Sequence, residues 1–123
     1  MRYDPAVGPD PKEWLELDES LRIQAVRQYH KRARLQSGSA EAHAIIHATV
    51  ETQLAMGHFA ARAALTRLSR EGLARHDIVH AIGSVLAEEF YEIAKSGGIH
   101  DAAAYARRLE ALTAESWRHG PEE

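Results

Sequence analysis

Apolar residues recur along most of the chain at spacings of three and four, which is typical of amphipathic helices. The strict alternation of apolar and polar residues that marks strands is nearly absent. The pattern predicts helices over residues 11–16, 18–35, 40–56, 59–71, 74–95 and 101–119. We therefore expect an all-α fold, a single-domain bundle of about four to five helices.

Capping residues predict where these helices begin and end. Asp10-Pro11 is typical of a helix start, since the carboxylate caps free N–H groups and proline suits the first turn. Asp18 is predicted to cap the next helix, and Ser39, in the loop "QSGS" at 36–39, the one after it. Gly57 and "SGG" are predicted to end helices, and Gly72 with Leu73 predicts a glycine cap with a hydrophobic contact. Residues 1–9 are expected to form an extended N-terminal lead-in, 10–119 the bundle and 120–123 a C-terminal tail.

Length and composition narrow the possible functions. The chain has 123 residues, no cysteine and a formal net charge of -3, which excludes thiolate chemistry and gives no overall attraction to nucleic acid. No apolar run is as long as a membrane span, and the N-terminus lacks the apolar core of a signal peptide. We therefore expect a cytoplasmic protein with no membrane partner.

Histidine is the unusual component, with eight residues in the chain and six of them between 30 and 80. In "EAHAIIHATVETQ", His43 and His47 lie four residues apart, and Glu51 lies four residues further on. "RHDIVHAIG" repeats the spacing with His76 and His80. At 100° per residue, His43 and His47 share an arc of about 60° with apolar residues of helix 40–56, so they lie within its apolar stripe.

The two histidine pairs are predicted to form one site. Helices joined by short loops tend to pack antiparallel, so helices 40–56 and 74–95 would run parallel, with all four imidazoles at one level. Two histidines at i and i+4 on a helix can bind one metal ion, and neutral imidazole suits Fe, Zn, Cu or Ni. Carboxylates are scarce near these histidines, which favours a mononuclear transition-metal centre ligated by His43, His47, His76 and His80. Such a centre, with an open position, could activate water or O₂.

Four further residues are candidates for the same site. Glu51 is predicted to be either a metal ligand or a carboxylate that orients a ligand. Arg22, Tyr29 and His30 lie on the apolar face of helix 18–35 and are candidates for holding the ligands in place. A buried arginine needs a carboxylate, so Arg22 is expected to pair with Glu51.

The sequence also allows other interpretations. The histidines could be a structural, hydrogen-bonded cluster in a non-enzymatic interaction or regulatory module, or a metal-free proton shuttle. The dyad in "RHDIVH" is similar to that of HD phosphohydrolases, for which His47 and Asp101 would have to supply the remaining ligands. The basic run "RQYHKRAR" at 27–34 could bind nucleic acid, but its charges lie opposite the apolar face. The last helix could cover the bundle or form a homodimer.

Three segments carry a resemblance to a known family: "WLELDESLRIQAVRQYH", "HAIIHATVETQLAMG" and "EGLARHDIVHAIGSVLAE". They closely resemble a bacterial family known as domain of unknown function 1841, over about residues 10–95. The family has Val-Glu-Asn-Gln where this chain has Val50-Glu51-Thr52-Gln53, so Thr52 replaces the family's asparagine. Position 52 faces away from the histidine stripe. The resemblance implies a bacterial origin and an all-helical domain, and it implies no particular activity.

Overall fold

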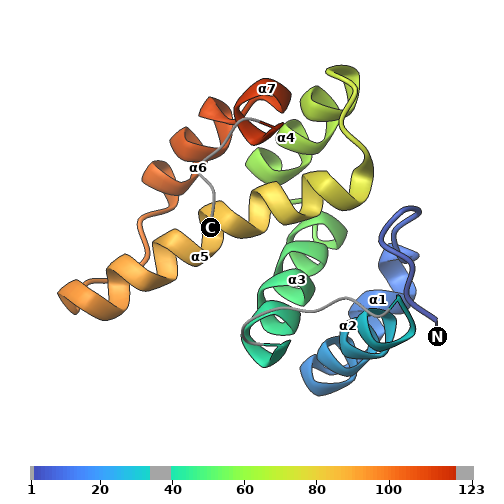
Figure 1. Ribbon diagram of the computed structural model, residues 1–123. Coiled ribbons are helices and arrows are strands. Elements are labelled where there is room, and N and C mark those ends of the chain that lie inside the picture. The colour runs from blue at the N-terminus through green and yellow to red at the C-terminus, as the bar shows by residue number, and fades with distance from the viewer. Residues whose placement is uncertain (1, 34–39, 119–123) are drawn as a thin grey trace. The chain divides into compact units, whose positions relative to one another are not determined.

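The computed structural model describes residues 2–33 and 40–118, which contain seven helices and no strand (Figure 1). The all-α class is confirmed, and the helix count is higher than expected. The helices are α1 (Pro11–Glu16), α2 (Glu19–Ala33), α3 (Ala40–Ala55), α4 (Phe59–Arg70), α5 (Arg75–Ser96), α6 (Ala102–Ala111) and α7 (Ala114–Arg118). The chain divides into two compact units, Met1–His58 with α1–α3 and Phe59–Glu123 with α4–α7. Of the described helices, none has the length and apolar character needed to cross a membrane.

The predicted starts of α1 and α2 are confirmed. Asp10 accepts a hydrogen bond from the Glu13 N–H at 3.0 Å, with proline in the first turn. Asp18 accepts the Leu21 N–H at 3.0 Å and the Ser20 hydroxyl at 2.8 Å. These hydrogen bonds, the backbone N–H of Leu21 first, hold the pKa of the Asp18 carboxyl below its usual value.

The predicted glycine ends of the helices are also confirmed. Gly57, Gly72 and Gly97 all have positive φ, the left-handed conformation that glycine adopts without strain. At the end of α4 the Leu73 N–H donates to the Leu68 carbonyl at 3.1 Å, and the Gly72 N–H donates to the Ser69 carbonyl at 3.0 Å. This pair of bonds is the Schellman motif, and both leucines are buried. The predicted loop and cap at 36–39, the last residues of helix 18–35 and the tail after 118 lie outside the described residues.

The prediction of one continuous helix over 101–119 is wrong. Asp101 caps α6 through the N–H groups of Ala103 and Ala104, but the helix stops before Leu112. Thr113 and Ser116 then exchange hydrogen bonds, each side chain accepting the other's N–H, which is the capping-box arrangement at the start of α7.

Helix α4 stabilises this break in the chain. Arg67 donates to the Leu112 carbonyl at 2.7 Å and to the Leu109 carbonyl at 3.1 Å, so it satisfies the end of α6. Glu71 accepts the Ala114 N–H at 2.7 Å, so it satisfies the start of α7. Each end has unpaired backbone groups that need such partners.

The core of the first unit forms where α1 and α2 pack on α3. Tyr3, Trp14 and Val26 pack against Ala44 and Ala48 of α3 in one buried cluster. The small side chains of the two alanines allow this close packing on α3. The Trp14 indole N–H donates to the Thr52 hydroxyl at 3.0 Å, which fixes α1 on α3.

The segment before α1 differs from the expected extended lead-in. The N–H groups of Val7 and Gly8 both donate to the Asp4 carbonyl, at 3.2 and 2.9 Å, and close a turn. Tyr3, just before this turn, is 1% exposed. The N-terminal segment is therefore part of the core of the first unit.

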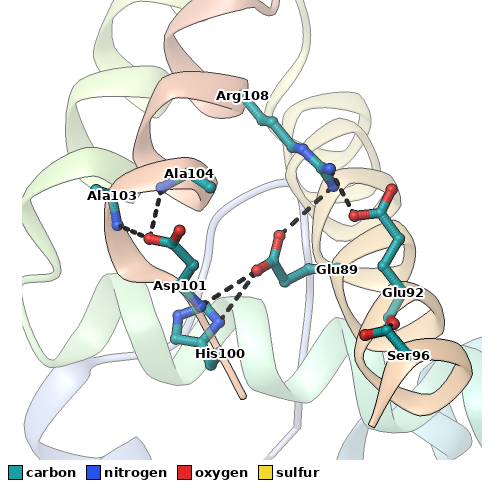
Figure 2. A network of polar contacts seen from close by, with 8 residues as sticks. All are labelled: Glu89, Glu92, Ser96, His100, Asp101, Ala103, Ala104 and Arg108. Atoms are coloured by element: carbon teal, nitrogen blue, oxygen red, sulfur yellow. Dashed lines mark hydrogen bonds and ion pairs between the residues drawn. The ribbon is translucent and has the colours of Figure 1, made fainter. Parts of the chain in front are cut away.

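In the second unit α4, α5 and α6 pack on one another pairwise (Figure 1). A network around Glu89 joins α5 to the start of α6 (Figure 2). Glu89 is 5% exposed, and its carboxylate lies 3.5 Å from an Arg108 nitrogen. The carboxylate also lies 3.7 Å from a nitrogen of the His100 ring and accepts the Asp101 N–H at 3.4 Å. Arg108 also donates to Glu92 at 2.7 Å, and this bond is the main reason that the pKa of Arg108 is raised.

Candidate functional site

Three histidines of the first unit lie together. His30 comes from the last turn of α2, and His43 and His47 come from α3. The ring centroids are 4.6 Å apart for His30 and His43, 5.3 Å for His30 and His47, and 6.0 Å for His43 and His47. Each ring offers one nitrogen within 4.8 Å of the others. This arrangement is compact enough for the three nitrogens to share one metal ion.

Helix geometry and small residues explain this proximity. The spacing of four places His43 and His47 on one face of α3, as the sequence predicts. Ala44 and Ala48 lie beside them in the sequence and are buried where α2 packs on α3, so the two helices can approach closely. That approach brings His30 against both rings. His30 was expected to support the candidate ligands, and the structure places its ring beside those of His43 and His47.

Tyr3 joins the cluster through His47, a contact that no pattern in the sequence predicts. The Tyr3 hydroxyl lies 2.8 Å from Nε2 of His47 and donates a hydrogen bond to Oε2 of Glu51. The phenol has one proton. Since that proton is donated to Glu51, the contact with His47 requires a proton on Nε2. In the neutral ring the lone pair is then on Nδ1, and a metal ion binds an imidazole through its lone pair.

Glu51 lies one turn beyond His47 on α3 and is 1% exposed. A buried carboxylate needs a hydrogen-bond donor, and the Tyr3 hydroxyl supplies one. The chain Glu51–Tyr3–His47 resembles the carboxylate-to-histidine contacts that orient metal ligands in proteins. Of the two roles that the sequence left open for Glu51, the geometry favours orienting a ligand through Tyr3.

The expected pair between Arg22 and Glu51 is wrong. Arg22 donates to the carbonyls of Trp14, at 3.0 Å, and Leu15, at 3.1 Å, and it lies 3.5 Å from the Thr52 hydroxyl. These carbonyls belong to the last turn of α1, where the Trp14 carbonyl also accepts the Leu17 N–H at 3.2 Å. Arg22 therefore caps α1 and plays no part in the histidine cluster.

Tyr29 forms a wall of the cluster. Its ring meets the His30 ring edge-on at 5.8 Å and the Tyr3 ring edge-on at 6.0 Å. Edge-to-face contacts of this kind restrict the orientation of both rings. Tyr29 was predicted to hold ligands in place, and its contact with His30 is consistent with that role.

The second predicted pair lies in the second unit. His76 and His80 are one turn apart on α5, and their ring centroids are 4.4 Å apart. The local spacing is therefore as the sequence predicts. That these two rings join His43 and His47 in one site stays a prediction.

Two of the alternative interpretations lose support. For the HD-type site, Asp77 is exposed and Asp101 is engaged in capping α6. For nucleic-acid binding, Arg27 lies 3.4 Å from Glu41 and Lys31 is exposed, as on an ordinary solvated helix face. Arg34 lies outside the described residues.

Comparison with protein families, with curated proteins and with solved structures finds no match to this chain. The resemblance to the domain of unknown function 1841 family therefore stays a prediction.

Proposed function

We propose that this protein binds a transition-metal ion through His30, His43 and His47. The observation that carries the proposal is the proximity of the three rings, each with a nitrogen within 4.8 Å of the others. Three histidines that leave coordination positions open are the ligand set of several catalytic zinc sites. Three imidazoles this close would repel one another if they were all protonated, and a shared cation is one way to use their lone pairs.

The donor set favours a single metal ion that is intermediate between hard and soft. Neutral imidazoles suit Zn, Fe, Cu and Ni, and the absence of cysteine excludes thiolate sites. The Glu51 carboxylate is engaged by Tyr3, which leaves few oxygen ligands for a second ion. If the centre is catalytic, its open position would activate water or O₂.

We also propose that His76 and His80 complete the ligand set, as the sequence predicts. A site with four or five histidines would bind metal more tightly and leave fewer open positions. Alanine at His80 would then weaken metal binding as much as alanine at His43.

The second candidate function is a non-enzymatic interaction or regulatory module with a structural histidine cluster. The contact of His47 with Tyr3 favours this alternative, because it gives the imidazole a role in holding the N-terminal segment even without a metal ion. Under this alternative the protein is stable without metal and gains nothing from it.

Calorimetric titration of the metal-stripped, untagged protein with Zn²⁺, Co²⁺, Ni²⁺ and Cu²⁺, with Fe²⁺ titrated without oxygen, tests the proposal. We expect one equivalent of at least one ion to bind, with affinity reduced by about tenfold or more in His30→Ala, His43→Ala and His47→Ala. His58→Ala is the matched control, because His58 lies past the end of α3 in the same unit. Binding that is absent, or equally weakened by His58→Ala, would favour the structural alternative.

A further inference from the structure

A pocket of about 350 Å³ opens in the first unit beside the N-terminal segment. It is lined by Arg2, Tyr3, Asp4, Tyr29, Arg32 and Ala33. Its size lies in the range of small-molecule sites, and its wall combines aromatic rings with charged groups.

The charged groups of this pocket favour an anion. Arg32 donates to the Tyr3 carbonyl at 3.0 Å, which fixes one end of its guanidinium and leaves other N–H groups for a ligand. Arg2 is exposed, and within the described residues it makes no hydrogen bond or ion pair. Asp4 is the one carboxylate, and its side chain accepts the Ala6 N–H at 3.0 Å. The pocket lining therefore has two positive guanidiniums and one carboxylate, and the carboxylate already accepts a hydrogen bond.

The aromatic wall favours a ligand with a flat or apolar body. The Arg32 guanidinium carbon lies 6.0 Å from the centre of the Tyr29 ring, at the limit for a cation–π contact. The guanidinium and the ring thus lie on the same side of the pocket. A carboxylate group can take two parallel N–H bonds from one guanidinium while its carbon skeleton rests against the ring.

We propose that this pocket binds a small organic carboxylate through Arg2 and Arg32, with its apolar body against Tyr29. The pocket also adjoins the histidine cluster, since Tyr3 and Tyr29 line it and contact the rings of His47 and His30. The bound carboxylate would be the substrate or coligand of the metal centre, and this second step rests on the proposed function.

Titration of the ¹⁵N-labelled, metal-free protein with benzoate, followed by NMR, tests the pocket independently of any metal. We expect saturable shifts at residues 2–4 and 29–33, with a Kd of about 1 mM or tighter. Arg32→Gln should weaken binding by about tenfold. Arg2→Gln should weaken it as well, and this variant removes no hydrogen bond or ion pair of the described residues. Arg27→Gln is the matched control, because it removes the same charge from α2 outside the pocket.

Three results would overturn the proposal: no saturable shift with benzoate, equal loss of binding in Arg27→Gln, or tighter binding of inorganic phosphate than of benzoate. Without a saturable shift there is no benzoate site in the pocket. Equal loss in Arg27→Gln would mean that benzoate binds only by general electrostatic attraction. Tighter binding of phosphate would mean that the ligand is an inorganic anion and not an organic carboxylate. If Arg32→Gln changes the NMR spectrum throughout the first unit, the benzoate affinity of Arg2→Gln serves as the test of the pocket. Because the protein is metal-free, failure here leaves the proposed metal site untouched.

Discussion

At the scale of the residue, Tyr3 connects the histidine cluster to the core of the first unit. Its hydroxyl contacts both His47 and Glu51, and its ring packs against Trp14 with the centroids 5.7 Å apart. It thus provides the donor for a buried carboxylate and sets the tautomer of a candidate ligand. One side chain links the stability of the first unit to the chemistry of the histidines.

Tyr3→Phe should lower the free energy of unfolding by about 1–3 kcal/mol, because it leaves the buried Glu51 carboxylate without this donor. Urea unfolding of the metal-free protein measures the effect. Tyr91→Phe is the control, since Tyr91 is 67% exposed and loss of its hydroxyl should change stability by less than about 0.5 kcal/mol. Equal stability of the two variants would show that the Tyr3 hydroxyl is not needed.

The same substitution should weaken metal binding by about 10- to 100-fold, because His47 loses the group that orients its ring. Metal titration of the folded Tyr3→Phe variant and of the wild type measures the two affinities. Unchanged affinity would remove Tyr3 from the account of the site while leaving the three histidines in place.

The histidines and Tyr3 show what sequence reasoning can reach at this scale. His43 and His47 were predicted because a spacing of four on a helix fixes their common face. Tyr3 was missed because it is 44 residues away from His47, in a segment with prolines and no periodicity. Arg22 was misassigned because its charge suggested a carboxylate, whereas its nearest acceptors are carbonyls at the end of α1.

At the scale of the element, capping interactions define where the helices begin and end. The Schellman motif after α4 requires the left-handed conformation at Gly72, whose φ is +93°. An added Cβ there would meet only a side-chain nitrogen of Arg118 at 3.6 Å, so the obstacle to substitution is the backbone conformation.

Gly72→Ala should therefore destabilise the protein by about 1–2 kcal/mol, the cost of a left-handed conformation for a residue with a Cβ. Gly98→Ala is the matched control, because Gly98 does not have a positive φ and only the flexible Ser96 hydroxyl is close to it. Urea unfolding compares the two variants. Equal effects would contradict the assignment of strain to Gly72.

The Asp18 cap should make the stability of α2 depend on pH. Because folding lowers the pKa of this carboxyl from 3.8, its contribution is complete above that value and is lost as the pH falls through the folded-state pKa. Urea unfolding between pH 2.5 and about 6 should show a steeper loss for the wild type than for Asp18→Asn, which keeps a capping oxygen without the charge. Parallel pH profiles would contradict this role.

Helix positions were largely predictable from the sequence because caps and glycine ends act locally. The exception is the break between α6 and α7. Thr113 and Ser116 gave a local signal for it, a threonine cap with a hydroxyl three residues later, which the continuous apolar pattern obscured. Arg67 and Glu71, which satisfy the two ends, come from a different helix and leave no pattern in that segment.

At the scale of the whole molecule, each unit depends on a buried carboxylate with partners from a distant segment. In the first unit Glu51 is held by Tyr3, and in the second unit Glu89 is held by Arg108 and by the start of α6 (Figure 2). Removing a partner of a buried charge is costly, because the charge is left uncompensated.

Arg108→Ala should lower the melting temperature by several degrees, because Glu89 loses its cation. Arg107→Ala is the matched control, since the neighbouring Arg107 is exposed and should have little effect. Calorimetry measures both variants. A difference of less than about one degree between them would show that the ion pair contributes little.

Elemental analysis of the untagged protein, purified without chelator, by inductively coupled plasma mass spectrometry tests the proposed metal site. We predict nearly one equivalent of Fe, Zn, Cu or Ni per chain, lost in His47→Ala and kept in His58→Ala. Less than about a tenth of an equivalent, even after metal supplementation, would contradict the metal site. The histidines of the first unit would then be a structural cluster, and partners would be sought instead.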